Sequence, residues 1–142
     1  MVAQGEFHAK INAFALAYLA ILGLVVGIWA CGFPAGFYSS FPGLGRTWVS
    51  VDGPFNEHLI RDTGAAFLMM GALSGLGWLR PHLVTPFAVG AATLCFNLPH
   101  FAYHMTHLGK FGLVDQIGNV FALLSALLAS VWLMTPRARL MA

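Results

Sequence analysis

The sequence predicts an all-α protein: an integral membrane four-helix bundle with both termini in the cytoplasm. Its 142 residues are 58% hydrophobic and only 8% charged, with a mean hydropathy of +0.76. Soluble domains carry roughly 25% charged residues, so this chain has too few charges to cover a surface exposed to water. It also holds four apolar runs, each near the roughly 20 residues needed to cross a bilayer. We therefore expect residues 1–142 to form a single membrane domain.

The apolar runs give the expected bounds of the helices, which are residues 11–33, 56–79, 83–107 and 113–134. Asn56 is a suitable N-cap for the second helix, Pro99 is expected to kink the third, and Pro136 ends the fourth. Small residues recur at helical spacing, which predicts close approach of the helix backbones. They include Gly23 and Gly27, Gly71 and Gly75, and Gly118, Ala122, Ala126 and Ala129.

Residues 34–55 are expected to form a long loop, because prolines and glycines interrupt any helix there. The loop is rich in aromatic side chains, which predicts a position at the membrane interface, capping the bundle. The basic residues divide into Lys10, Arg80, Arg137 and Arg139 on one side of the predicted membrane and Arg46 and Lys110 on the other. Because the richer side is usually cytoplasmic, the loop is expected outside.

Ionisable side chains gather at the outer end of the predicted bundle. Four of the six histidines and four of the five acids fall there. The second helix opens with Glu57, His58, Arg61 and Asp62, the third closes with Asn97, His100, His104 and His107, and the fourth opens with Asp115, Gln116 and Asn119. Residues four apart share a helix face, so each helix carries a polar stripe. Polar stripes are costly against lipid, so we expect them to face one another.

The first hypothesis for this cluster is a metal site. The i,i+4 pairs His58/Asp62 and His100/His104 can supply four ligands, and His107 continues the second stripe. If the two helices adjoin, helical rise places His58 level with His104 and Asp62 level with His100. Imidazole and carboxylate ligands suit zinc, iron, manganese or copper, and haem b between His58 and a third-helix histidine is a variant. The protein would then be a metal- or haem-binding membrane redox protein.

The second hypothesis is a pocket for an organic ligand, lined by Glu57, Arg61, Asp115 and Asn119. Arg61 can clamp an anionic or carbonyl group while a histidine and a carboxylate move protons. Arg61 also lies inside an apolar span and needs a counter-ion, which can be Glu57, Asp62 or Asp115. The ligand of such a membrane enzyme would be a lipid headgroup or a quinone, although no nucleophile motif identifies a reaction.

The third hypothesis, which we favour, is that the cluster is structural. Glu57 and Arg61 are an ordered i,i+4 ion pair, and His58, Asp62 and the third-helix histidines can satisfy one another. The protein would then contact the lipid bilayer and other membrane subunits, as an accessory subunit of a larger complex or as a homo-oligomer, without a cofactor. A net charge of +2 and the lack of basic runs give no sign of nucleic-acid binding.

The four-helix layout, with a polar opening to the second helix, resembles small bacterial membrane proteins of the DoxX-like kind. The residues that carry the likeness are Asn56-Glu57-His58-Leu59-Ile60-Arg61-Asp62-Thr63-Gly64 and the small-residue helix after them. The resemblance implies a multi-pass protein of the bacterial cytoplasmic (inner) membrane that works with partner redox proteins. It implies no catalytic residue, and the histidine stripe of the third helix is not part of it.

The predicted topology can be tested by thiol labelling. A cysteine introduced near Gly45 should react with a membrane-impermeant reagent added outside the cell, because residues 34–55 are expected on that side. Reporter fusions at the two termini should report the cytoplasm. Labelling of the introduced cysteine only from the cytoplasmic side would reverse the orientation.

Overall fold

The computed structural model describes residues 2–135, and it confirms a predominantly helical protein. The helices are α1 (Val2–Gly32), α2 (Pro34–Ser40), α3 (Glu57–Leu79), α4 (Pro86–His107) and α5 (Leu113–Leu133), with a 3-10 turn, Leu108–Lys110, before α5. Between α2 and α3 lie two short antiparallel strands, β1 (Pro42–Gly43) and β2 (Arg46–Thr47). Pro136, Arg137 and Arg139, which were used to predict the last helix end and the orientation, lie outside the described residues.

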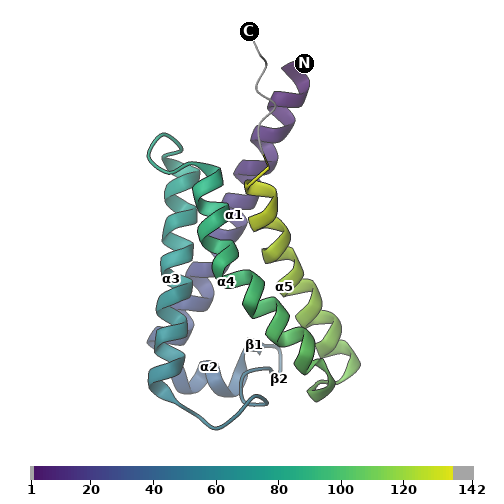
Figure 1. Cartoon of the computed structure of the whole chain (residues 1–142). Helices are drawn as coiled ribbons and strands as arrows, with labels where there is room; N and C mark the ends of the chain where they lie inside the picture. Colours follow the sequence, from purple (N-terminus) through teal and green to yellow (C-terminus); the bar gives the residue numbers. More distant parts are fainter. Residues whose placement is uncertain (1, 136–142) are drawn as a thin grey trace.

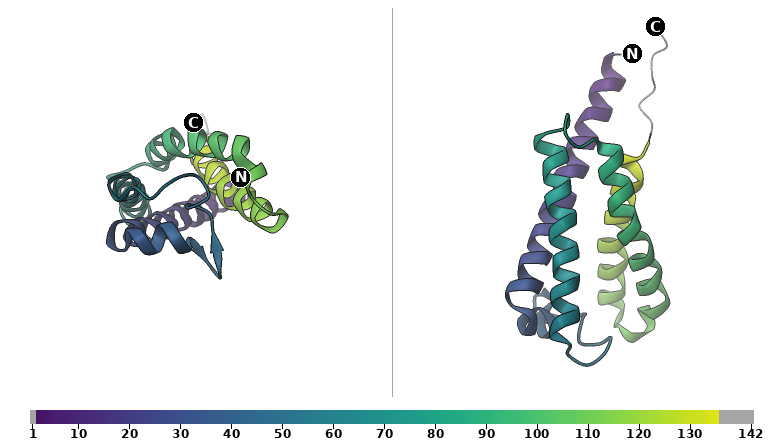
Figure 2. Two further views of the ribbon diagram at one scale, coloured as in Figure 1. Left: turned by 90° about the horizontal axis from the view of Figure 1, so that it is seen from below. Right: turned by 60° about the vertical axis from the view of Figure 1, so that its left-hand side comes forward.

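The four long helices run up and down the molecule as two pairs (Figure 1). α1 packs along α3 and α4 packs along α5, whereas contacts between the two pairs are fewer. The beginning of α1, the α3–α4 turn and the end of α5 lie together at one end. The opposite end, which we call the hairpin end, carries α2, the two strands and the α4–α5 turn. Seen from below, the chain between β2 and α3 crosses the hairpin end (Figure 2).

Glycines let α1 and α3 approach until their backbones touch. A Cβ built on Gly71 would lie 2.7 Å from the backbone nitrogen of Leu24, and one on Gly23 would lie 2.7 Å from the Cα of Gly71. A Cβ on Gly27 would lie 2.8 Å from the carbonyl oxygen of Gly64. These contacts leave no room for any side chain. The prediction that Gly23, Gly27 and Gly71 mediate close helix packing is therefore confirmed.

Buried polar side chains join α4 to α5. The hydroxyl oxygens of Thr93 and Ser130 lie 2.9 Å apart, and the amide of Asn97 donates to Ser130 Oγ at 2.9 Å. Ser130 Oγ also donates to the carbonyl of Ala126 at 3.0 Å. Gly90 lies against the Ser130 carbonyl oxygen, where a Cβ would approach to 2.6 Å. The glycine lets the backbones meet, and the hydrogen bonds then set how the two helices align.

Helix boundaries follow local signals that apolar runs alone do not reveal. α1 begins at Val2 rather than at residue 11, because the residues before the apolar run include good helix formers such as alanine, glutamate and lysine. α4 begins at Pro86 rather than at residue 83, because Thr85 caps the helix and proline suits its first turn. Asn56 caps α3 as predicted. Pro99 lies inside α4, which stays continuous and changes direction along its length (Figure 1).

The segment 34–55 is not the helix-free loop that was predicted. It opens with α2, in which Pro34 takes the first helical position, where a missing N–H and a fixed φ are no obstacle. Phe37 of α2 is buried and packs its ring against Trp29 of α1 and against Phe41, with centroid distances of 5.8 and 4.7 Å. The aromatic side chains of the segment therefore fold back onto α1.

Substitution of Gly71 by alanine should destabilise the protein, because the added methyl group meets the α1 backbone. Gly75→Ala on the same helix is a matched control, since the nearest atom to its new methyl group is the Cβ of Ala20 at 3.9 Å. We expect Gly71→Ala to cost about 1–3 kcal/mol through overpacking, and Gly75→Ala to be neutral or to stabilise by up to about 1 kcal/mol. Thermal unfolding in detergent measures both, and equal midpoints would contradict the close contact.

Candidate functional site

Arg61 joins the start of α3 to the end of α1 at the hairpin end. Its Nε and Nη2 lie 2.9 and 2.8 Å from Glu57 Oε1, and its Nη1 donates to the carbonyl oxygen of Cys31 in the last turn of α1. A cation beside the last carbonyl groups of a helix is favoured by the helix dipole. The expectation that Arg61 has a nearby counter-ion is confirmed, and that counter-ion is Glu57. The Glu57–Arg61 pair is about half exposed and therefore does not line a closed pocket. Through the bond to Cys31, Arg61 links α3 to α1.

His58 and Asp62 form a separate pair on the outer side of α3. His58 Nε2 lies 3.3 Å from Asp62 Oδ2, and the two side chains are 87% and 63% exposed. Ile60 and Gly64 are the buried positions of this turn, and a shift of two residues turns a side chain by about 200° around the helix. Contrary to the expectation of facing stripes, no hydrogen bond or ion pair within residues 2–135 joins this pair to α4.

The histidines of α4 are packed among aromatic rings. The ring of His100 lies 6.2 Å from Phe67 of α3 and 4.9 Å from Phe96, and His104 meets it edge-on at 4.7 Å. The Nδ1 atom of His104 is buried and has no hydrogen-bond partner in the described part of the chain. His107 instead places its Nδ1 2.8 Å from a carbonyl oxygen of its own helix. The three histidines therefore share a stripe without sharing one centre.

Asp115, in the first turn of α5, holds the hairpin. Its Oδ1 accepts hydrogen bonds from Arg46 Nη1 at 2.7 Å and from Trp48 Nε1 at 2.8 Å. The Trp48 ring lies over Gly118, where a Cβ would approach it to 3.0 Å. Asp115 is thus the counter-ion of Arg46 and not of Arg61. Sequence reasoning missed this contact because 69 residues separate the two partners.

A second ion pair ties the chain before α3 to the α4–α5 turn. Lys110 Nζ donates to Asp52 Oδ1 at 2.9 Å, and both side chains are partly exposed. Together with the contacts of Asp115, this pair holds residues 48–56, the crossing segment between β2 and α3, over the hairpin end (Figure 2). Asp52, Lys110, Arg46 and Trp48 were not among the predicted site residues.

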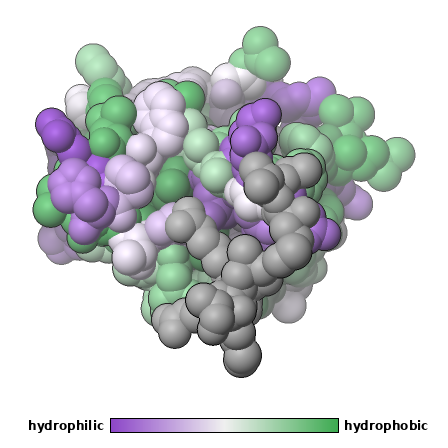
Figure 3. Space-filling view, turned by 90° about the horizontal axis from the view of Figure 1, so that it is seen from above, coloured by the Kyte–Doolittle hydropathy of each residue, from purple (hydrophilic) through white to green (hydrophobic). Residues whose placement is uncertain are grey.

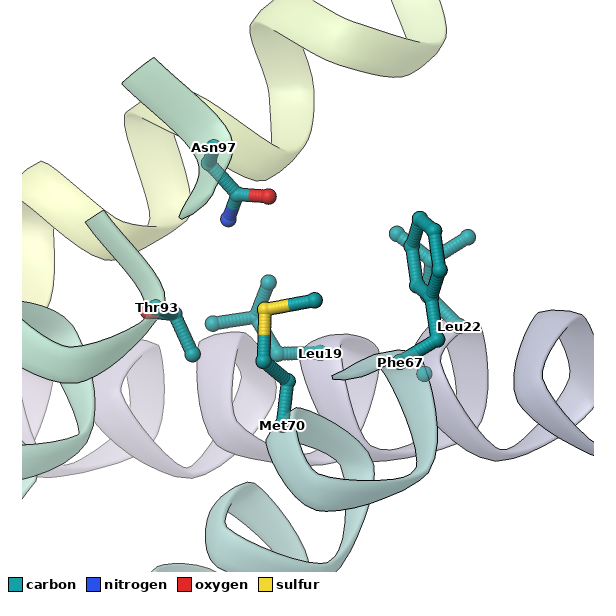
Figure 4. Close-up of a pocket in the computed structure, with 7 residues that line it drawn as sticks. Leu19, Leu22, Phe67, Met70, Thr93 and Asn97 are labelled. Carbon is teal, nitrogen blue, oxygen red and sulfur yellow. The ribbon is translucent and has the colours of Figure 1, made fainter. Parts of the chain in front are cut away.

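A small hollow lies inside the molecule, between α1, α3 and α4 (Figure 4). Its lining is apolar apart from two side chains of α4, and the residues around it include Leu19, Leu22, Phe67, Met70, Thr93 and Asn97. Its volume of about 10 Å³ is room for about one water molecule, far less than a quinone ring needs. Asn119, which was predicted to bind a ligand, is buried elsewhere and donates to the carbonyl of Asp115 at 3.3 Å.

In the described residues, no three His, Cys, Asp or Glu side chains come together in a group that could hold a metal ion. The predicted ligands divide between the exposed pair of α3 and the packed histidines of α4. Comparison with protein families, with curated proteins and with solved structures found no match. Metal binding and the likeness to DoxX-like proteins both stay predictions.

Replacing Asp115 by asparagine should loosen the hairpin, because Arg46 then loses its charged partner and the charge-assisted bond from Trp48 is weakened. Hydrogen exchange of residues 42–52 should become several-fold faster. Asp62→Asn is the matched control. Within residues 2–135 the ion-pair partner of Asp62 is exposed His58, so this variant should leave that exchange unchanged. Equal exchange in both variants would show that Asp115 does not hold the hairpin.

Proposed function

We propose that this chain is a multi-pass integral membrane protein of a bacterial cytoplasmic membrane, spanning it four times as a helix bundle. We further propose that it serves as a structural or accessory subunit of a larger membrane complex. The observation that carries the membrane part is the apolar outer surface. Large apolar side chains are exposed on all four long helices, and they include Phe14, Ile21 and Ile28 of α1, Leu59, Met69 and Leu76 of α3, Phe87 and Leu98 of α4, and Ile117, Phe121 and Leu128 of α5.

Most of the buried residues are apolar, but several of the fully buried side chains are polar. Of the five largest, four are Ser74, Thr93, Asn119 and Ser130. Soluble monomers rarely expose apolar patches larger than a few hundred Å². From above, apolar side chains project from several points of the rim, with polar side chains beside them (Figure 3). Hydrocarbon around the long helices would suit their exposed apolar side chains.

Helix length and hydropathy support two of the four proposed spans. Two stretches, Gln4–Gly32 of α1 and Leu113–Leu133 of α5, are long and apolar enough to cross a membrane. A core helix of a soluble protein passes the same test but is mostly buried, whereas only 22% of the α5 span is buried inside the molecule. Lipid around α5 accounts for its exposed apolar side chains better than water does.

The accessory role is supported by how the polar residues at the hairpin end are used. Glu57, Asp52 and Asp115 are each engaged with a basic residue that ties two segments together. The inner hollow is too small for an organic substrate. These interactions stabilise one arrangement of the chain, and the exposed His58/Asp62 pair remains available to a partner subunit.

A second candidate function, metal or haem binding, is favoured by one observation. The buried Nδ1 atom of His104 has no hydrogen-bond partner in the described residues, although buried polar atoms usually have one. His104 lies beside His100, and a neutral imidazole nitrogen is a good ligand for a transition metal such as zinc, iron, manganese or copper. A partner subunit or a shift of the crossing segment would have to supply the remaining ligands.

Purification of the tagged chain from membranes tests both candidates. We expect it to resist extraction by alkaline carbonate and to co-purify with other membrane subunits in fixed proportion, without metal or a Soret band. His104→Ala should then change only stability or assembly. Recovery of the chain in the soluble fraction would contradict the membrane proposal. A stoichiometric metal or haem that His104→Ala removes and Asp62→Asn retains would replace the accessory role with the second candidate.

A further inference from the structure

A second hollow lies at the hairpin end, between the hairpin and the α4–α5 turn. It has a volume of about 350 Å³ and opens to the outside, a size within the usual range for small-ligand sites. Its lining includes Gly45 and Arg46 of the hairpin, and Lys110, Gly112 and Asp115 around the start of α5. We call it the hairpin hollow. Of the four residues in the organic-ligand pocket that the sequence predicted, Asp115 lies in this lining, whereas Glu57, Arg61 and Asn119 do not.

The lining of the hairpin hollow is largely polar and carries two cations, Arg46 and Lys110, each of them paired with an acid. Arg46 uses only Nη1 in its bond to Asp115, and in the described residues its other guanidinium N–H groups have no acceptor. The ammonium of Lys110 donates to Asp52 and is likewise partly exposed. Arginine and lysine with spare donors are the side chains that bind phosphate oxygens. The spare donors of Arg46 and Lys110, rather than an excess of positive charge, therefore favour a phosphate group.

Backbone amides at the start of α5 also favour a phosphate group in the hairpin hollow. Gly112 is the N-cap of α5, and its lack of a side chain leaves the first-turn N–H groups without a side-chain cap. α3 and α4 are capped by Asn56 and Thr85. Nothing lies within 4 Å of a Cβ built on Gly112, so the approach to these amides is open. The start of a helix carries partial positive charge, and its free N–H groups can bind a phosphate group that reaches them.

We propose that the hairpin hollow binds a phosphate group, held by Arg46, Lys110 and the first-turn amides of α5. Its source is a phospholipid headgroup or a small phosphorylated solute. The lipid source rests on the proposed membrane location. The hollow adjoins Leu113, where the candidate span Leu113–Leu133 begins, and phospholipid headgroups lie at the ends of membrane spans. Leu44, fully exposed at the hairpin tip and part of the rim, would then contact the glycerol and acyl region of the same lipid.

The test uses the full chain in detergent, with lipid binding followed by native mass spectrometry. Dioleoyl phosphatidylglycerol is the probe, and dioleoylglycerol, with the same acyl chains and no phosphate, is the matched control. Saturable binding of the first and not of the second is expected. Arg46→Gln and Lys110→Gln should each weaken binding at least about fivefold. Arg80→Gln removes an equal charge at the opposite end of the molecule and should change nothing.

Gly112→Asp separates loss of the site from loss of the fold. Aspartate is a preferred N-cap and the position has room for its Cβ, so the thermal midpoint should hold or rise. The new carboxylate would nevertheless occupy the amides and repel phosphate, and we expect binding to fall at least about tenfold. Gly112→Asn provides the cap without the charge and should lose less.

Each outcome has a defined meaning. Saturation by inorganic phosphate without phosphatidylglycerol binding would support the phosphate site and assign it to a solute. That result would leave carbonate extraction as the separate test of the membrane location. Unchanged phosphatidylglycerol binding in Arg46→Gln, Lys110→Gln and Gly112→Asp would overturn the proposal. So would equal binding of dioleoylglycerol, or no binding of either phosphate probe.

Discussion

The backbone contact between α1 and α3 is the constraint on which the rest of the structure depends. Gly23 and Gly71 allow the two helix axes to approach more closely than any pair of side chains would permit. This contact places the end of α1 beside the first turn of α3, where Arg61 can reach both Glu57 and the carbonyl of Cys31. It also decides which side of α3 is buried, and therefore turns His58 and Asp62 outward.

The second helix pair is held by different chemistry. α4 and α5 meet through Gly90 and through the hydrogen bonds of Thr93, Asn97 and Ser130. Hydrogen bonds of this kind are electrostatically stronger away from water, and the glycine again brings the backbones close. Contacts between the two helix pairs are fewer than contacts within them. The ion pair between Asp115 of α5 and Arg46 of β2 adds a link between the second helix pair and the hairpin.

The polar residues at the hairpin end thus have two roles. Three of the acids, Asp52, Glu57 and Asp115, form ion pairs with basic residues. The basic residues that partner them, Arg46 and Lys110, keep spare donors in an open hollow. The proposed accessory membrane subunit with a phosphate-binding end is consistent with these two roles. The ion pairs hold together the segments that line the hollow, and the spare donors would bind the phosphate.

The sequence by itself determined the features that depend on neighbours along the chain. Hydropathy located the long helices, Asn56 signalled the start of α3, and i,i+4 spacing identified the Glu57–Arg61 pair, because each of these involves residues within one or two turns. Only the tertiary structure decided which face of each helix is buried, and so separated His58 and Asp62 from the histidines of α4. It also decided that Asp115 pairs with Arg46, because a contact across 69 residues leaves no periodic signal and depends on how two helix pairs and a hairpin come together.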